Sequence, residues 1–226
     1  MITIRKQELY RYLGYRGGAQ PDAEVLARIA ECEPRLQEAA APRFLIQQVP
    51  VVLNPGIYSS SGEQAIPHLM IAGMEIVSAD LQKNLENCDE VILFAATLGP
   101  GPDLLIRRAS AQRMSDAVIY QAMSAEMIES YCDEICAQLR REAAEKGLYL
   151  RPRFSPGYGD LPLDLQKDLL RILDAPKKIG LTLTDSLLMM PSKSVTALIG
   201  LTKKPQPDHE KDCAICPKTD CAFRRE

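Results

Sequence analysis

The nearly continuous apolar stretch from Val91 to Leu98, VILFAATL, is the part of this chain that decides the fold. It has the length of a strand, and its lack of polar alternation predicts a central strand that is buried on both faces. The turn Gly99-Pro100-Gly101-Pro102 ends it. Residues 103–146 then contain no Gly or Pro, and their apolar stripe predicts a short helix, a break near residues 110–115 and a long helix capped by Gly147.

Shorter periodic segments lie on both sides of this unit. Asp22 is expected to cap a helix that runs to about Ala41 and is kinked or divided at Pro34. Residues 44–53 alternate as a strand, and Pro50 favours an edge position. Further predicted elements are a strand at 75–77, a helix capped by Ser78 or Asp80, a helix at 161–173, and strands at 178–184 and 194–201.

Length and composition describe an ordinary folded protein. The 226 residues allow one large or two small domains, and 46% hydrophobic content rules out disorder throughout. A net charge of −3 argues against nucleic acid as a partner, and the lack of a long apolar run argues against a membrane span. We expect a domain over residues 1–202, helical over about 1–90, followed by a linker and cysteine-rich tail at 203–226.

Seven cysteines, an odd number without an apolar export segment, indicate a reducing, cytoplasmic location. Four lie in apolar patterns and are expected to be buried thiols: Cys32, Cys88, Cys132 and Cys136. The other three, Cys213, Cys216 and Cys221, have C-x2-C-x4-C spacing. Thiolates spaced in this way can bind zinc or an iron–sulfur cluster, with a fourth ligand from His209, a nearby Asp or a partner; the alternative is a reduced tail without metal.

Two loops are candidates for ligand binding. The glycines of the 99–102 turn could let backbone N–H groups approach a phosphate or carboxylate, although a simple strand–turn–helix junction explains them equally well. The second loop, residues 151–160, joins two arginines to a turn with the sequence SPGYG. Arginine offers a planar fork for a carboxylate or phosphate, and Tyr158 offers a ring face for a base or cation. The alternative is a rigid surface loop.

The second loop begins a set of linked motifs. They are Arg153-x-x-Pro156-Gly157-Tyr158 and, about twenty residues later, Ile179-Gly180-x-x-Leu183-Thr184-x-Ser186-x-x-Met189-x-Pro191-x-x-Ser194-Val195. Together with Ala95-Ala96-Thr97-Leu98-Gly99 they resemble the activation domain of cobalamin-dependent methionine synthase, over about residues 91–201. The chain looks like a stand-alone relative of that domain, whose members share the Tyr12-Leu-Gly-Tyr15 start and the cysteine tail. The resemblance implies an α+β fold, with a mixed, largely antiparallel twisted sheet packed against long helices.

The resemblance also implies a function. Domains of this family bind S-adenosylmethionine (AdoMet) and dock onto the cobalamin module of methionine synthase or, as an alternative, another corrinoid protein. An electron from a separate donor and a methyl group from AdoMet together convert cob(II)alamin to methylcobalamin. The chain would thus be an accessory component without a catalytic side chain of its own, because the electrophile is the ligand and the nucleophile is cobalt.

Carried over by motif, the resemblance assigns a ligand site to the second loop. Arg153 would hold the ligand carboxylate, the backbone around Ser155 and Pro156 would meet the adenine end, Gly157 would permit close approach, and Tyr158 would lie against the ligand. The same stretch, exposed, would dock the partner.

The chain departs from the family after Tyr158, where Gly159-Asp160-Leu161-Pro162-Leu163 replaces a Pro-Ala-Cys-Pro stretch. The family's acidic partner for the ligand amino group has no aligned counterpart, and Glu75 and Asp80 are possible substitutes. A metal or iron–sulfur redox module on the same fold is therefore a second alternative, and a conventional AdoMet methyltransferase is a third.

Overall fold

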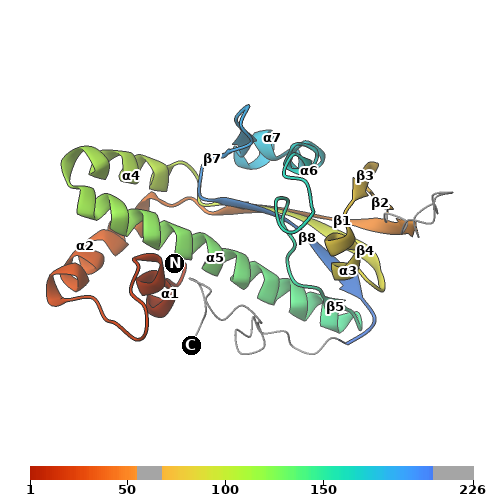
Figure 1. Cartoon of the computed structure of the whole chain (residues 1–226), viewed down its shortest axis with the longest axis horizontal. Helices are drawn as coiled ribbons and strands as arrows, with labels where there is room; N and C mark the ends of the chain where they lie inside the picture. The colour runs from red at the N-terminus through yellow and green to blue at the C-terminus, as the bar shows by residue number, and fades with distance from the viewer. Residues whose placement is uncertain (55–67, 206–226) are drawn as a thin grey trace.

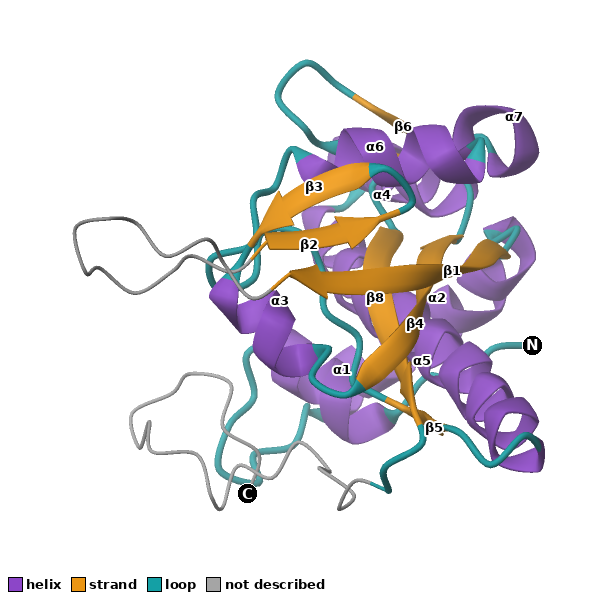
Figure 2. Cartoon of the chain, turned by 90° about the vertical axis from the view of Figure 1, so that its right-hand side faces the viewer, coloured by secondary structure: helices purple, strands orange, loops and turns teal. Residues whose placement is uncertain are grey.

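A computed structural model describes residues 1–54 and 68–205, which form a twisted antiparallel sheet with helices on both faces (Figures 1 and 2). The helices are α1 (Lys6–Tyr12), α2 (Ala23–Ala39), α3 (Ala79–Asn84), α4 (Gly101–Gln112), α5 (Met114–Glu145), α6 (Leu165–Leu173) and α7 (Ala175–Ile179). The strands are β1 (Arg43–Asn54), β2 (His68–Ile71), β3 (Met74–Val77), β4 (Cys88–Thr97), β5 (Tyr149–Leu150), β6 (Thr182–Leu183), β7 (Met189–Met190) and β8 (Ser194–Thr202).

The predicted central strand is β4, paired with β1 on one side and β8 on the other. Its side chains alternate between two cores. One core, which contains Ile92, Phe94 and Ala96, lies against α1, α2 and α5. The other, which contains Val91, Leu93 and Ala95, lies against α3, α6 and α7. The strand is continuously apolar because helices cover both faces of the sheet.

The large sheet has the order β3-β2-β1-β4-β8-β5, and every strand pair among the described residues is antiparallel. Strand β1 pairs with β4 as far as Pro50 and with β2 from Val51 onward. Among the described strands, residues 43–50 of β1 therefore pair with β4 alone, and Pro50 is the last of them. Because no described strand pairs with the other side of β1 at this position, the missing N–H of Pro50 costs no hydrogen bond there. The fold class predicted from the sequence is confirmed.

The helical predictions also agree with the structure. Helices α4 and α5 are separated by the extended residue Arg113, and Gly147 closes α5 with a φ of 68°. Asp22 caps α2 by accepting a hydrogen bond from the Val25 N–H. Pro34, in contrast, does not divide α2, which is one helix from residue 23 to residue 39.

Three sequence predictions are wrong in part. Among the described residues of the first 90, only α1, α2 and α3 are helical, because residues 43–54, 68–71 and 74–77 form strands. Residues 178–184 do not form one strand, since α7 ends at Gly180 and only Thr182–Leu183 pair with β7. The helix predicted at 161–173 is shorter than expected, because α6 begins only at Leu165.

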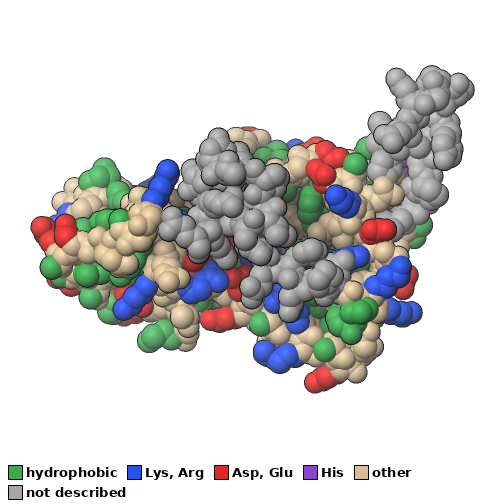
Figure 3. Space-filling view, turned by 60° about the horizontal axis from the view of Figure 1, so that its bottom comes forward, with side chains coloured by type: hydrophobic (Ala, Val, Ile, Leu, Met, Phe, Trp, Pro, Cys, Tyr) green, Lys and Arg blue, Asp and Glu red, His purple; other side chains and the backbone are tan. Residues whose placement is uncertain are grey.

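All four core thiols are buried and reduced, as predicted. Cys213, Cys216 and Cys221 lie outside the described residues, so the metal site and the separate tail stay predictions. Within residues 1–54 and 68–205, the helices are too short or too polar to cross a bilayer. Basic and acidic side chains are interspersed on the visible part of the face in Figure 3, in keeping with the small net charge.

Candidate functional site

The segment that carries Arg153 runs along the outer edge of β8. The Arg151 N–H donates to the Gly200 carbonyl at 2.8 Å, and Phe154 exchanges two hydrogen bonds with Leu198 at 2.8 and 2.9 Å. These backbone bonds continue the edge begun by β5 and hold residue 153 between two fixed points. Arg153 therefore extends from the rigid edge of the sheet and not from a free loop.

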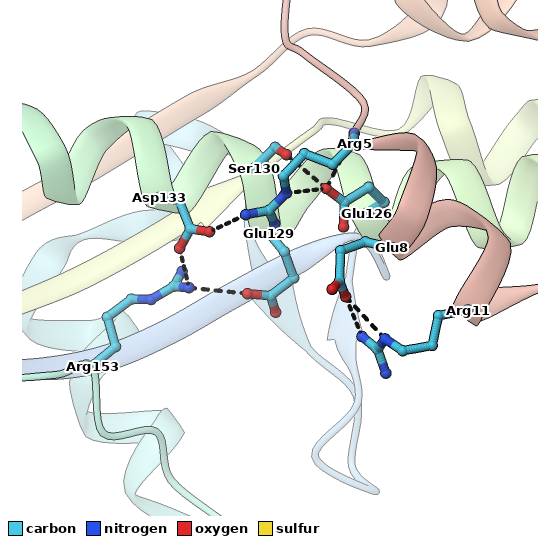
Figure 4. A network of polar contacts seen from close by, with 8 residues as sticks. All are labelled: Arg5, Glu8, Arg11, Glu126, Glu129, Ser130, Asp133 and Arg153. Carbon is cyan, nitrogen blue, oxygen red and sulfur yellow. Dashed lines mark hydrogen bonds and ion pairs between the residues drawn. The ribbon is translucent and has the colours of Figure 1, made fainter. Parts of the chain in front are cut away.

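The Arg153 guanidinium reaches α5, where it meets two carboxylates (Figure 4). Its Nη2 lies 3.0 Å from Glu129 Oε2 and 2.9 Å from Asp133 Oδ1. Arg5, just before α1, approaches from the other side, with Nε 2.6 Å from Glu126 Oε1 and Nη1 2.9 Å from Asp133 Oδ2. The three acids share one face of α5 because they are spaced by three and four residues.

This ion network contains two buried atoms without a partner among the described residues. They are Nη1 of Arg153 and Oε2 of Glu126. The Glu126 side chain is only 1% exposed, while those of Glu129 and Asp133 are 37% and 47% exposed. An unpaired donor and an unpaired acceptor in one buried network are costly, at about 1–3 kcal/mol each. The arrangement therefore calls for a ligand or water that both donates and accepts hydrogen bonds.

The neighbouring groups keep Arg153 charged. Burial disfavours the cation, but the negative charges of Cys132 and Cys136, which ionise only at high pH, and of Glu129 and Asp133 outweigh it, so the pKa of Arg153 is raised. Burial in turn raises the pKa of Cys132 to about 12, so that this thiol stays protonated at neutral pH. The charge of the site thus comes from the arginines and carboxylates alone.

An aromatic residue from the N-terminal segment lies beside the acids. The pKa of the Tyr12 phenol is raised by burial and by the negative charges of Glu129 and Glu126. The Arg11 guanidinium lies 4.8 Å from the centre of the Tyr12 ring, and it also pairs with Glu8 at 2.6 Å. Tyr12 opens the Tyr-Leu-Gly-Tyr start noted in the sequence, so that segment belongs to the surroundings of the site.

The turn after Arg153 is compact. The Ser155 carbonyl accepts a hydrogen bond from the Tyr158 N–H at 3.1 Å, and Gly157 donates to the Leu161 carbonyl at 2.9 Å. Pro156 is buried, whereas the Tyr158 side chain is 68% exposed. Gly157 has a φ of 90°, and an added Cβ would lie 3.1 Å from Leu163 Cδ1, so the turn itself requires glycine.

Asp160 anchors this turn to the start of α3. Its carboxylate accepts hydrogen bonds from the Ser78 hydroxyl, from the Ala79 N–H at 2.7 Å and from the Asp80 N–H at 3.2 Å. The Asp80 carboxylate in return accepts from the Asp160 N–H at 3.2 Å. These bonds, led by the one from Ser78, lower the pKa of Asp160. The substituted stretch after Tyr158 is thus a structural clamp in this chain.

The first candidate loop has a packing role. A Cβ on Gly101 would lie 1.9 Å from the Ala39 carbonyl oxygen, so glycine is needed there for close contact with the end of α2. Asp103, in the first turn of α4, accepts hydrogen bonds from the N–H and hydroxyl of Ser192 at 2.7 and 2.5 Å. The simple strand–turn–helix interpretation of this junction accounts for both observations.

The structure also changes which residues make up the site. Glu75 pairs with His68 and Asp80 binds the Asp160 backbone, whereas the acids that lie beside Arg153 are Glu129 and Asp133. The expected exposed docking stretch needs correction as well, because the Arg153 side chain is only 15% exposed.

Sequence reasoning missed Arg5 and the three acids of α5. Carboxylates at positions 126, 129 and 133 of one helix were the available signal, because their spacing places them on a single face.

Fold and site together define a class of α+β protein in which an antiparallel sheet supports a charged site between its edge and one long helix. Comparison with known families matches residues 76–207, more than half of the chain, to the family described as vitamin B12 dependent methionine synthase, activation domain. The chain belongs to this family.

Among solved structures, the chain is similar to a crystal structure of the MetH reactivation domain bound to AdoHcy, with a TM-score of 0.61 and 16% sequence identity. The match covers 88% of this chain and 74% of that one. At this identity the likeness concerns the fold. No curated protein matches the chain.

Proposed function

We propose that this protein binds AdoMet at the Arg153 site and supports reactivation of a cobalamin-dependent methionine synthase. Membership of the activation-domain family and the likeness to a reactivation domain with bound AdoHcy support the proposal. The observation that carries it is the unpaired Arg153 Nη1 together with the unpaired Glu126 Oε2 in one ion network.

An amino-acid head group carries the hydrogen-bonding groups that these two atoms lack. Its carboxylate accepts hydrogen bonds, as the free Arg153 nitrogen requires, and its ammonium donates them, as the free Glu126 oxygen requires. AdoMet carries such a head group and supplies a transferable methyl group when bound. The residues of this chain bind and orient the ligand, and none needs to act as acid, base or nucleophile.

Ligand binding would change the partners of Arg153. Glu129 and Asp133 now hold its Nη2, and both side chains are exposed enough to turn into water. An incoming carboxylate would take their place, and a displaced acid could then face the ligand ammonium. Tyr12, whose pKa responds to the charges of Glu129 and Glu126, would offer a cationic sulfonium the ring face that Arg11 does not cover. Within the turn, neither the Ser155 N–H nor the Pro156 carbonyl has a backbone partner among the described residues, so both could meet the adenine end. Tyr158 remains the exposed candidate for ligand or partner contact.

Calorimetric titration with AdoMet tests the binding step. Arg153→Ala should weaken binding by about 10–100-fold, as expected for the loss of charged hydrogen bonds, and Arg153→Lys should restore part of the affinity. Arg171→Ala is the matched control, since Arg171 also pairs with an acid, Asp168, at 2.8 Å but lies on the exposed side of α6. Unchanged affinity in Arg153→Ala, with the protein folded, would contradict the assignment.

Reactivation tests the partner. The inactive cob(II)alamin form of a methionine synthase core, an electron donor and AdoMet are combined with and without this protein, and recovered activity is measured. Rescue of a different corrinoid methyltransferase alone would redirect the proposal to that system. Absence of AdoMet binding, together with iron and acid-labile sulfide in anaerobically purified protein, would favour a redox module.

A further inference from the structure

A second charged site lies at the other end of α5. Helices α2, α4 and the first turns of α5 meet at the left of Figure 1 and enclose a cleft of about 550 Å³. This volume lies within the usual range for small-molecule pockets. Asp116 in the cleft and Asp133 in the Arg153 network are 17 positions apart on α5, which at 1.5 Å per residue is about 25 Å. The cleft is therefore separate from the proposed AdoMet site.

The lining of the cleft is strongly basic. It contains four arginines, Arg28, Arg35, Arg108 and Arg113, and two acids, Glu31 and Asp116. Both acids are bound by a single arginine. Arg28 meets Asp116 with Nε and Nη2 at 3.1 and 2.5 Å, and its Nη1 lies 2.5 Å from Glu31. Because Arg28 already holds these acids, the cleft has an excess of two positive charges.

The remaining arginines have no carboxylate partner in the described part of the chain. Arg35, Arg108 and Arg113 are all exposed, and Arg35 lies near the Tyr120 hydroxyl, whose pKa is raised chiefly by burial. Three arginines therefore line the cleft without a salt bridge to any described residue. Arginine forks match the oxygens of phosphate in pairs, which makes such a cluster suited to phosphate groups.

The backbone adds to this positive potential. Arg113 is the N-cap residue of the 32-residue helix α5, and no side chain caps that end. The first N–H groups of a long helix present a partial positive charge that attracts anions. The lining also has an apolar part, formed by Leu105 and Ala109 of α4. The cleft thus combines cationic and apolar side chains.

From this combination we infer that the cleft between α2, α4 and α5 binds a small polyphosphorylated molecule, such as a nucleoside triphosphate. The phosphates lie against Arg35, Arg108 and Arg113, and the remainder of the ligand lies over Leu105 and Ala109. AdoMet is a poor occupant, because its sulfonium is repelled by the uncompensated arginines. The inference does not depend on the proposed reactivation role.

Titration calorimetry of the full chain with pyrophosphate, ATP and adenosine, at low and high salt, tests the inference. Pyrophosphate and ATP should both bind, and binding should weaken as salt rises because the arginines are exposed. Adenosine alone should bind at least about tenfold more weakly than ATP, since it lacks the charged groups. If ATP binds and pyrophosphate does not, the cleft recognises the whole nucleotide. If both bind with equal affinity, the cleft recognises the phosphates alone.

Neighbouring arginines on α4 provide a matched control. Arg108→Gln combined with Arg113→Gln should weaken ATP binding about tenfold or more, whereas Arg107→Gln, one position away and outside the cleft, should leave it within about twofold. None of these arginines has a carboxylate partner among the described residues, so the variants should unfold at the denaturant midpoint of the parent. Lack of binding by both phosphate probes at millimolar concentration would overturn the inference. An equal loss in Arg107→Gln, or binding of acidic peptides alone, would also overturn it.

Discussion

Gly159→Ala tests whether the turn that carries the site depends on its contact with α3. Gly159 has a φ of 53°, and an added Cβ would lie 2.1 Å from Asp80 Oδ2. The left-handed conformation costs a non-glycine residue about 1–2 kcal/mol. The Asp80 carboxylate, which is exposed, must also move away and give up its hydrogen bond from the Asp160 N–H, worth about 1 kcal/mol. We expect a total loss of about 2–3 kcal/mol in the free energy of unfolding.

Gly180→Ala is the matched control for this variant. Gly180 has a φ of 70°, but nothing lies within 4 Å of its added Cβ, so it should lose only the conformational part, about 1–2 kcal/mol. Urea unfolding followed by circular dichroism measures both variants. For an m-value of about 2 kcal/mol/M, the midpoint should fall by about 1 M or more for Gly159→Ala and by clearly less for Gly180→Ala.

A double-mutant cycle isolates the contact. With Asp80→Ala in place, Gly159→Ala should cost no more than Gly180→Ala, because the group that it displaces is gone. Equal losses for the two glycine variants in the parent protein, or an unchanged cost of Gly159→Ala after Asp80→Ala, would refute the reasoning.

Three further predictions concern other parts of the molecule. Gly101→Ala should destabilise the protein by about 1–3 kcal/mol, because its Cβ meets the fixed Ala39 backbone; a gain in the urea midpoint, as helix propensity alone would give, would contradict this. The lowered pKa of Asp160 contributes stability that is present above its ordinary 3.8 and is lost as pH falls through the folded-state pKa. Asp160→Asn should therefore reduce the fall in urea midpoint between about pH 5 and pH 3, and an unchanged slope would exclude Asp160 as its source. Cys132, with a pKa raised to about 12, should resist iodoacetamide at pH 8 until the protein is unfolded, and mass spectrometry should find it modified only then; rapid labelling of the native protein would show that the thiol is accessible.

Local patterns predicted most of the elements. The apolar run at 91–98 indicated a two-sided strand, and the Gly- and Pro-free stretch after it indicated two helices, because burial and helix capping depend on neighbouring residues. Residues 178–184 were misassigned as a strand. There, Pro176 lies in the first turn of a short helix that Gly180 ends, and these two residues decide the structure more strongly than the β-branched residues Ile179, Thr182 and Thr184.

Of the charged residues in the candidate site, only Arg153 was predicted from the sequence. Arg153 stood out because its motif is local, but its partners are 20 and 24 residues away on α5, and Arg5 approaches from the N-terminus. The cleft arginines were equally invisible, since they come from three helices. The spacing of residues along the chain does not show which charged side chains from distant segments lie side by side in the fold.

The order of nearby residues was enough to predict the central strand, the long helix, the buried thiols and the family motif around Arg153, because each of them is a local pattern. The contacts between distant segments emerge only in the folded chain, where Arg153 lies against Glu129 and Asp133, Asp160 clamps the turn to α3, and arginines without a salt bridge to any described residue line a cleft at the far end of α5. Ion pairs and clefts of this kind form between elements that the sheet brings together, and their energies depend on distance and burial in space.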